Sequence, residues 1–296
     1  MNYQKLGNSN LNVSELGFGC MSLELDKGVD SITDLVRSAY RAGINLFDTA
    51  DLYDRGKNEE MLGTALKPIR DQVLISTKVG NEWREDGSGW EWNPSKEYIL
   101  TGITESLRRL QTDYIDLYML HGGTIDDPID ESIEAFERLK KQGKIRAYGI
   151  SSIRPNTIKE WVKRSNIDCV MMQYSLLDRR PEEEILDLLA DNDISVLTRG
   201  TLAKGMLIDK PAEDYLGYSA QEVERLKKAL FDAGEPLGTS IKYVQQHPAV
   251  ASVVAGMRTK SQLQELISAN DLQTVTQNEL HKIGKVLRPN LYQNHR

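Results

Sequence analysis

Residues 44–53 read Ile44-Asn45-Leu46-Phe47-Asp48-Thr49-Ala50-Asp51-Leu52-Tyr53. A short apolar run there leads into an acidic turn that carries a tyrosine. Two more apolar runs end in polar residues, at 73–78 in Lys78 and at 115–121 in His121. Short apolar runs rich in β-branched residues are typical of strands buried on both faces. Because a parallel barrel collects the residues at its strand ends on one face, we expect these polar side chains to meet there.

Size and composition are those of an ordinary globular protein. The chain has 296 residues, 40% of them apolar and 27% charged, and we expect one barrel domain over 1–296. The net charge of −7 argues against a nucleic-acid or anionic-membrane partner. Residues 1–12 are polar, and no apolar run approaches the roughly 20 residues of a spanning helix, so neither a signal peptide nor a membrane segment is expected.

The cysteines and histidines argue against a disulfide-rich secreted protein and against a metalloprotein. Cys20 and Cys169 are too few for a disulfide framework, which favours a reducing cytoplasm. The four histidines have no spacing typical of metal ligands, so we expect no metal.

Eight apolar segments alternate with amphipathic ones along the chain. The expected strands are 16–19, 44–47, 73–77, 115–120, 145–150, 169–173, 195–198 and 251–255. The expected helices are 31–41, 58–66, 95–110, 129–142, 156–164, 182–190, 220–246 (broken near Gly234) and 261–269. This alternation, with right-handed crossovers, predicts an α/β fold of the closed (β/α)8 TIM-barrel class. The rival is an open doubly wound sheet, but its glycine-rich turn does not follow the first strand.

Both ends of the chain carry additional elements. Residues 3–6 and 12–14 flank a Gly-Asn-Ser-Asn turn and predict an N-terminal β-hairpin. Residues 277–287 predict a C-terminal helical tail that ends before Pro289. The segments 80–93 and 201–219 are too long for simple connections, and we expect both to be loops over the site.

The assembled pattern resembles the aldo-keto reductases over essentially the whole chain. The family motif D-T-A-x-x-Y, followed by N-E-x-x-x-G, matches residues 48–53 and 58–63. Leu120-His121 and residues 144–151 are further matches. The resemblance implies reduction of aldehydes and ketones with NAD(P)H.

Four catalytic roles follow from the resemblance. Tyr53 would be the general acid for the carbonyl oxygen, although a phenol with a pKa of ~10 is a weak acid at neutral pH. Lys78 would favour the phenolate, and Asp48 would keep that buried ammonium charged. His121 would orient the carbonyl. Taken singly, each residue also has a structural interpretation, such as a core tyrosine or a helix cap.

The nicotinamide side departs from the family pattern. Ser151 and Ser152 stand where many relatives have Ser-Asn. Met171 occupies the place of the usual glutamine, and Gln173, on the same side of the strand, could serve from one step further along. The alternative is that Gln173 only starts the loop. Arg199 replaces an aromatic residue that stacks on the ring, and its planar guanidinium could stack or hydrogen-bond.

The phosphate and adenosine sides are also recognisable by resemblance. The phosphate loop would consist of Gly200, Leu202, Lys204 and Gly205, with Lys210 more distant. The adenosine segment would consist of Gly256, Arg258 and Gln262, with Glu265 in place of an expected asparagine and with Cys20 and Met21 beside the cofactor. Arg258 at a helix start would bind a 2′-phosphate, assisted by Lys260, which predicts NADPH. The alternative is a solvated basic turn.

The substrate pocket is expected from apolar side chains. Met21, Trp83, Trp90 and Trp92 would form its walls and admit varied carbonyl compounds. The alternative for the tryptophans is a loop that packs on itself.

We therefore predict an NADPH-dependent carbonyl reductase, a monomer or weak homo-oligomer that binds cofactor before substrate. A Schiff-base aldolase that uses Lys78 is a second hypothesis, but it needs a lowered amine pKa. An NADPH-binding, redox-sensing subunit of a membrane channel is a third.

Overall fold

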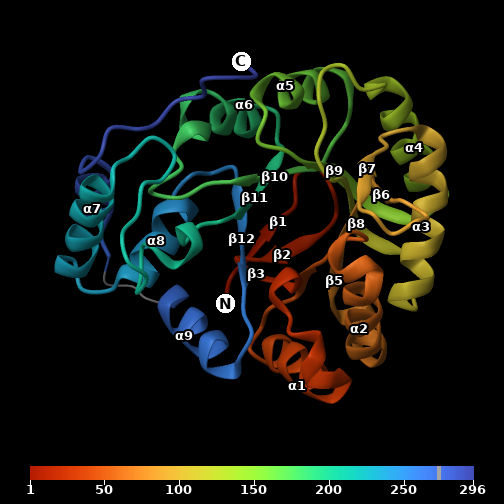
Figure 1. The fold of residues 1–296 in the computed structure, drawn as a ribbon, viewed down its shortest axis with the longest axis horizontal. Helices are drawn as coiled ribbons and strands as arrows, with labels where there is room; N and C mark the ends of the chain where they lie inside the picture. The colour runs from red at the N-terminus through yellow and green to blue at the C-terminus, as the bar shows by residue number, and fades with distance from the viewer. Residues whose placement is uncertain (272–274) are drawn as a thin grey trace.

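The fold is a closed barrel of eight parallel strands ringed by helices, as the sequence predicts (Figure 1). It is seen in a computed structural model that describes residues 1–271 and 275–296. Around the barrel the strands run in the order β10-β11-β12-β3-β4-β5-β8-β9. Their bounds are β3 Leu16–Gly19, β4 Leu46–Asp48, β5 Leu74–Val79, β8 Ile115–Leu120, β9 Ile145–Ser151, β10 Cys169–Gln173, β11 Ser195–Arg199 and β12 Val250–Gly256.

The helices cover the outer face of the barrel (Figure 1). They are α1 Gly28–Arg41, α2 Lys57–Leu66, α3 Lys96–Leu110, α4 Ile129–Lys141, α5 Pro155–Arg164, α6 Ile185–Asp191, α7 Ala220–Asp232, α8 Pro236–Gln245, α9 Lys260–Asn270 and α10 Gln277–Gly284. Ser95 caps α3 by accepting a hydrogen bond from the Tyr98 amide. The break between α7 and α8 lies at Gly234, which has a φ of +103°, and α10 ends three residues earlier than predicted.

The predicted N-terminal hairpin closes one end of the barrel. Its strands are β1 Tyr3–Lys5 and β2 Asn12–Ser14. Leu6 and Val13 are fully buried and pack with inward-facing barrel residues such as Leu117 and Met119. The Gly7 amide donates to Ser195 Oγ at 2.7 Å, at the start of β11, so the hairpin lies at the amino ends of the strands.

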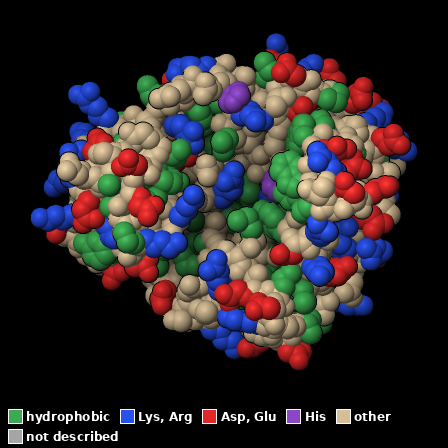
Figure 2. All heavy atoms as spheres, in the orientation of Figure 1, with side chains coloured by type: hydrophobic (Ala, Val, Ile, Leu, Met, Phe, Trp, Pro, Cys, Tyr) green, Lys and Arg blue, Asp and Glu red, His purple; other side chains and the backbone are tan. Residues whose placement is uncertain are grey.

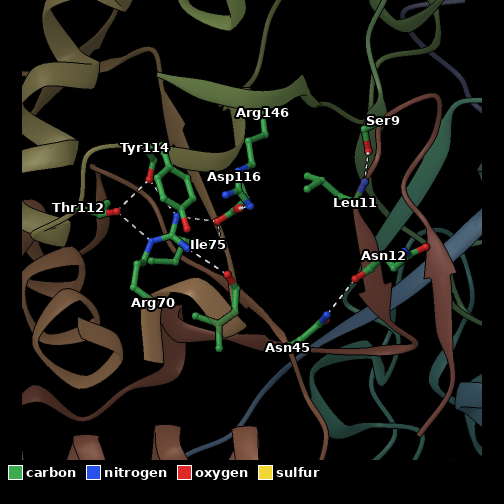
Figure 3. Close-up of polar contacts among 11 residues, drawn as sticks. Ser9, Leu11, Asn12, Asn45, Arg70, Ile75, Thr112, Tyr114, Asp116 and Arg146 are labelled. Atoms are coloured by element: carbon green, nitrogen blue, oxygen red, sulfur yellow. Dashed lines mark hydrogen bonds and ion pairs between the residues drawn. The ribbon is translucent and has the colours of Figure 1, made fainter. Parts of the chain in front are cut away.

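A buried charge cluster stabilises the same end (Figure 3). Asp116, near the start of β8, accepts from Arg70 at 2.6 Å and from Arg146 at 2.9 Å. Both guanidinium carbons lie 4.1 Å from the ring centroid of Tyr114. In a parallel barrel, the amino ends of the strands serve stability, and the opposite end is left for function.

The segment 80–93 is not an irregular loop, which corrects the sequence prediction. It forms the antiparallel hairpin of β6 Asn81–Trp83 and β7 Trp90–Trp92, with Trp83 opposite Trp90. Aromatic pairs across two strands stabilise such hairpins. Trp92 anchors this one, because its Nε1 donates to Asp127 at 3.0 Å and its ring packs over Gly80.

Short 3-10 turns complete the description. They are η1 Cys20–Ser22, η2 Leu25–Lys27, η3 Tyr53–Gly56, η4 Lys67–Gln72, η5 Arg180–Glu183 and η6 Ala203–Gly205. Among the helices of residues 1–271 and 275–296, none combines the length and the apolar character needed to cross a bilayer.

Candidate active site

Three neighbouring strands bring the four predicted catalytic side chains together. Asp48 ends β4, Lys78 lies in β5 and His121 follows β8, while Tyr53 opens η3 just beyond β4. The rings of Tyr53 and His121 meet edge to face with centroids 5.9 Å apart. The Lys78 ammonium lies 5.4 Å from the centroid of the Tyr53 ring. These side chains therefore form one cluster at the carboxyl ends of the strands.

Lys78 is fully buried and all its donors are used. Its Nζ donates to both carboxylate oxygens of Asp48 at 2.8 Å and to the Thr49 carbonyl at 2.7 Å. Burial alone would lower the pKa of Lys78, but the Asp48 carboxylate and Tyr53 outweigh it and the pKa is raised. The amine is therefore charged at neutral pH, which argues against the Schiff-base hypothesis because that chemistry needs a neutral amine.

Tyr53 is half-buried, and its phenol is influenced by opposing effects. Burial raises its pKa most, the Lys78 charge lowers it and Asp48 raises it again, so that the net shift is upward. Lys78 acts in the direction expected from the sequence, but burial outweighs it. Tyr53 therefore holds its proton at neutral pH and would release it only to a group in the site that gains negative charge.

His121 is neutral over the physiological range. Burial, reinforced by the positive charges of Lys78 and Arg199, lowers its pKa to about 3. Its Nδ1 is buried and has no hydrogen-bond partner among the described residues. A neutral imidazole carries one proton, so His121 could donate a hydrogen bond to a carbonyl oxygen but not a net charge.

The turn that carries Tyr53 is held by residues that sequence reasoning left without a role. Thr49 Oγ1 donates to Asn58 Oδ1 at 2.8 Å, and Asn58 Nδ2 donates to the Cys20 carbonyl at 2.9 Å. Asp54 and Arg55 follow Tyr53 with φ values of 50° and 55°, an uncommon conformation that marks strained, functional segments. The N-E motif at 58–59 was the signal that could have indicated this support.

The residues expected to hold the nicotinamide gather at neighbouring strand ends. Ser151 ends β9, and it and Ser152 are buried. Gln173 pairs in register with Arg199, and its Cγ lies 3.7 Å from where a Cβ on Gly200 would stand. Met171 packs inside the barrel, so Gln173, two residues further along β10, faces the barrel mouth.

The expected phosphate loop combines left-handed backbone and basic side chains. Gly200 and Gly205 have φ values of +70° and +94°, and Lys204 has a φ of +58°. The Lys210 side chain passes 3.3 Å from where a Cβ on Gly205 would stand, so the two lie side by side. Leu202 is half-buried at the start of this turn. Figure 2 shows a hollow in the middle of the face seen in Figure 1, with Lys and Arg side chains around it.

The expected adenosine segment surrounds the start of α9. Arg258 is exposed, and its amide donates to Gln262 Oε1 at 2.8 Å. Thr259 caps the helix, and Glu265 accepts from Ser261 at 3.0 Å. Gly256 is tightly packed, because a Cβ there would stand 2.3 Å from Ser22 Oγ. The absence of a Cβ at this position therefore lets the chain's own η1 turn approach the end of β12 closely.

The expected pocket residues differ in exposure. Met21 is 69% exposed, whereas Cys20 is fully buried in the core. Trp83 and Trp90 line an open hollow of about 600 Å³ beside the Tyr53 turn, together with Leu25, Leu52 and Arg55. The Arg55 guanidinium lies 4.9 Å from the Trp83 ring. Trp92 is instead engaged with Asp127 in holding the hairpin.

The model of the Aldo/keto reductase family matches residues 15–288. The chain belongs to this family. It is therefore a nicotinamide-dependent oxidoreductase of the carbonyl-reducing type on a (β/α)8 barrel. Its membership rests on nearly the whole chain, from the start of the barrel to beyond α10.

Two curated relatives and one solved structure are similar to this protein over most or all of its length. An uncharacterised oxidoreductase of Bacillus subtilis, YqkF, is 48% identical, with both chains covered fully. The NADH-specific methylglyoxal reductase of Escherichia coli is 31% identical over 89% of this chain and 92% of its own. The holo form of aldo-keto reductase AKR11C1 from Bacillus halodurans has a TM-score of 0.93 at 48% identity, covering 100% of this chain and 99% of that one.

The residues at the barrel mouth fit a nicotinamide dinucleotide. Buried hydroxyls and an amide stand at the ends of β9 and β10, and the basic side chains of Lys204, Lys210 and Arg258 stand where the sequence predicts the phosphate and adenosine contacts. Within the described ranges, no group of three His, Cys, Asp or Glu residues could hold a metal ion.

Proposed function

We propose that this protein reduces aldehydes or ketones with NADPH, with Tyr53 as the proton donor. The observation that carries the proposal is the cluster of Tyr53, His121 and the buried Lys78–Asp48 pair at the barrel mouth. The cofactor supplies the hydride when bound. Every other step belongs to side chains of this chain.

Tyr53 would donate its proton to the carbonyl oxygen as negative charge develops there. The Lys78 ammonium would then stabilise the phenolate left behind, because opposite charges within a few ångström favour the ionised form. His121, neutral by its lowered pKa, would donate a hydrogen bond to the same oxygen and orient it. In the reverse direction Tyr53 would accept the proton.

The preference for NADPH rests on Arg258. It lies exposed beside the capped start of α9, where a 2′-phosphate would meet both a guanidinium and the positive end of the helix dipole. The relative from Escherichia coli is named NADH-specific, so the affinities of this protein for NADPH and for NADH must both be measured. Ser151, Ser152 and Gln173 would hold the amide of the nicotinamide, and Arg199 would lie against its ring.

The substrate is proposed to be a small carbonyl compound. Trp83 and Trp90 would supply apolar walls, and the hollow that they line is wide open. We further propose a monomer or a weak homo-oligomer, with cofactor binding first and the segment 201–219 closing over it. Product-inhibition patterns typical of random addition would contradict that order.

A titration and an assay test the proposal together. The purified protein is titrated with NADPH and with NADH by tryptophan fluorescence, and oxidation of each is followed at 340 nm with 4-nitrobenzaldehyde. We expect Tyr53→Phe to lower kcat by about 10²–10⁴-fold, the usual contribution of a general acid, with little change in the Kd for NADPH. The control is Tyr3→Phe at an exposed tyrosine. Unchanged turnover in Tyr53→Phe would contradict the assignment.

The redox-sensing hypothesis gives a different result in the same experiment. Tight NADPH binding without oxidation on any carbonyl tested would favour it over the reductase.

A further inference from the structure

Asp51 is a buried acid in the Tyr53 turn that the proton transfer described above does not use. Asp51 is only 8% exposed, and its Oδ1 has no hydrogen-bond partner among the described residues. Buried polar atoms without partners are rare in folded proteins, and each such atom needs an explanation. A protonated carboxyl tolerates this position far better than a carboxylate does.

Asp51 is connected through the backbone to both Lys78 and Tyr53. Its amide donates to the Lys78 carbonyl at 3.3 Å, which ties the turn to β5. Tyr53 lies two residues further along the same turn. A change in the charge or hydration of Asp51 therefore acts on the segment that sets the distance between Tyr53 and Lys78.

The charges around Asp51 are already paired without it. Lys78 is matched by Asp48, at 2.8 Å. Arg109 on α3 is matched by Glu59 on α2, at 2.6 Å, and Glu59 also accepts from Thr77. Asp51 is thus a third carboxyl beside two matched pairs.

The titratable groups facing Asp51 come from four neighbouring elements. Burial and then the Glu59 charge raise the pKa of Asp51 to about 8, against weaker lowering by Arg109, by the Leu52 amide and by Lys78. Tyr98 on α3 and Tyr118 on β8 also interact with its charge, and burial raises the pKa of both phenols. Glu82 on β6 interacts in turn with Tyr98. No cation in this set is left over for an ionised Asp51.

We propose that Asp51 is a positioning residue for the proton transfer, neutral in the working enzyme, and that its ionisation lowers turnover. An ionised Asp51 would add a negative charge that interacts with Lys78, and so would weaken the effect by which the Lys78 charge favours the phenolate that Tyr53 becomes. It would also draw water to the turn, because an unpaired buried carboxylate is costly. The inference rests on the proposed function of Tyr53.

The kinetic test compares pH profiles of kcat for carbonyl reduction in wild type, Asp51→Asn and Asp71→Asn. The last variant removes the same charge at an exposed residue outside the Tyr53 turn. We expect the kcat of wild type and of Asp71→Asn to fall about tenfold per pH unit above the Asp51 pKa of about 8. Asp51→Asn should lack this fall, because an amide mimics the protonated acid and cannot ionise. An identical alkaline fall in Asp51→Asn would overturn the proposal.

A stability measurement tests the same residue without using turnover. Asp51 has a pKa raised from 3.8 to about 8 in the folded state, so the unfolded chain loses the proton first and wild-type stability falls as pH rises through that window. The denaturation midpoint of Asp51→Asn should therefore rise relative to wild type from pH 4 to 8 and then stay level. If the difference in midpoint between Asp51→Asn and wild type did not change with pH, Asp51 would not be a buried neutral acid. A wild type without turnover would instead contradict the proposed function while leaving this readout intact.

Discussion

Lys78 Nζ lies 2.8 Å from each carboxylate oxygen of Asp48, in a position where Lys78 is fully buried. Ser76 also donates to Asp48 Oδ1 at 2.8 Å, so the carboxylate is held from two sides. A buried ion pair of this geometry serves more to keep the ammonium charged than to stabilise the fold, because desolvation offsets most of the attraction.

Removing one member of this pair should cost much more than removing both. We expect Asp48→Leu to lower the free energy of unfolding by about 3–5 kcal/mol, because it leaves a buried ammonium without a partner. The double variant Asp48→Leu/Lys78→Met should recover most of that loss. Urea denaturation of wild type, both single variants and the double variant measures this coupling. If the losses in stability of the two single variants added up in the double variant, the coupling would be contradicted. The control is Glu105→Gln, at the exposed ion pair with Arg108, which should change the urea midpoint little.

Arg258→Ala should weaken NADPH binding much more than NADH binding. A charged hydrogen bond to the 2′-phosphate contributes about 1.5–3 kcal/mol, so the Kd for NADPH should rise about tenfold or more. The Kd for NADH should change little, because NADH has a hydroxyl at that position. Fluorescence titration with both nucleotides measures this. Arg225→Ala on the exposed face of α7 removes the same charge elsewhere, and equal losses for the two nucleotides would mean that Arg258 does not contact the phosphate.

Asp116→Ala should destabilise the barrel without lowering turnover. The change leaves the Ile75 amide without its acceptor and removes the carboxylate that pairs with both Arg70 and Arg146, so that Arg70 keeps only uncharged acceptors (Figure 3). We expect a loss of about 3 kcal/mol in the free energy of unfolding, typical of a broken buried pair.

The control for Asp116 is Asp113→Ala, an exposed aspartate just before the same strand. Urea denaturation and kcat at 25 °C are measured on both variants. A large fall in kcat of folded Asp116→Ala would contradict the separation of the stabilising end of the barrel from the candidate site.

His121 should make stability fall in acid. Its pKa is about 3 in the folded state against an ordinary value near 6.5, so the unfolded chain binds a proton that the folded chain refuses. Stability should therefore be lost as pH falls from about 6.5 toward 3, and His121→Asn should lose less over that window. His281→Asn, at an exposed histidine on α10, should behave as wild type. Parallel stability curves for wild type and His121→Asn would show that His121 is not held neutral.

Some features followed from local sequence patterns because short-range physics governs them. The eight strands, the Ser95 cap and the break at Gly234 depend on apolar runs, a hydroxyl acceptor and a backbone that only glycine adopts easily. The position of Lys78 and His121 at strand ends followed in the same way. Parallel strands of one barrel end at one face, so residues far apart in sequence could be expected to meet.

The hairpin at 81–92 was missed because its strands are only three residues long and polar in part. It is held by the ladder between its two strands and by the hydrogen bond from Trp92 to Asp127, a contact with a distant loop. Periodicity over three residues carries no comparable signal.

The chemistry of the candidate site depended most on the three-dimensional arrangement. The residue order specified which acids, amines and phenols would be available at the barrel mouth. Which carboxyl stays neutral, which cation has a partner and how far burial raises the pKa of Tyr53 follow from packing. Asp48 and Asp51 are three residues apart in one motif, yet Asp48 is paired with a buried ammonium, whereas the two cations that act on Asp51, Arg109 and Lys78, are each paired with another carboxylate. Charge pairing and desolvation depend on distances across strands and helices, and no spacing along the chain encodes those distances.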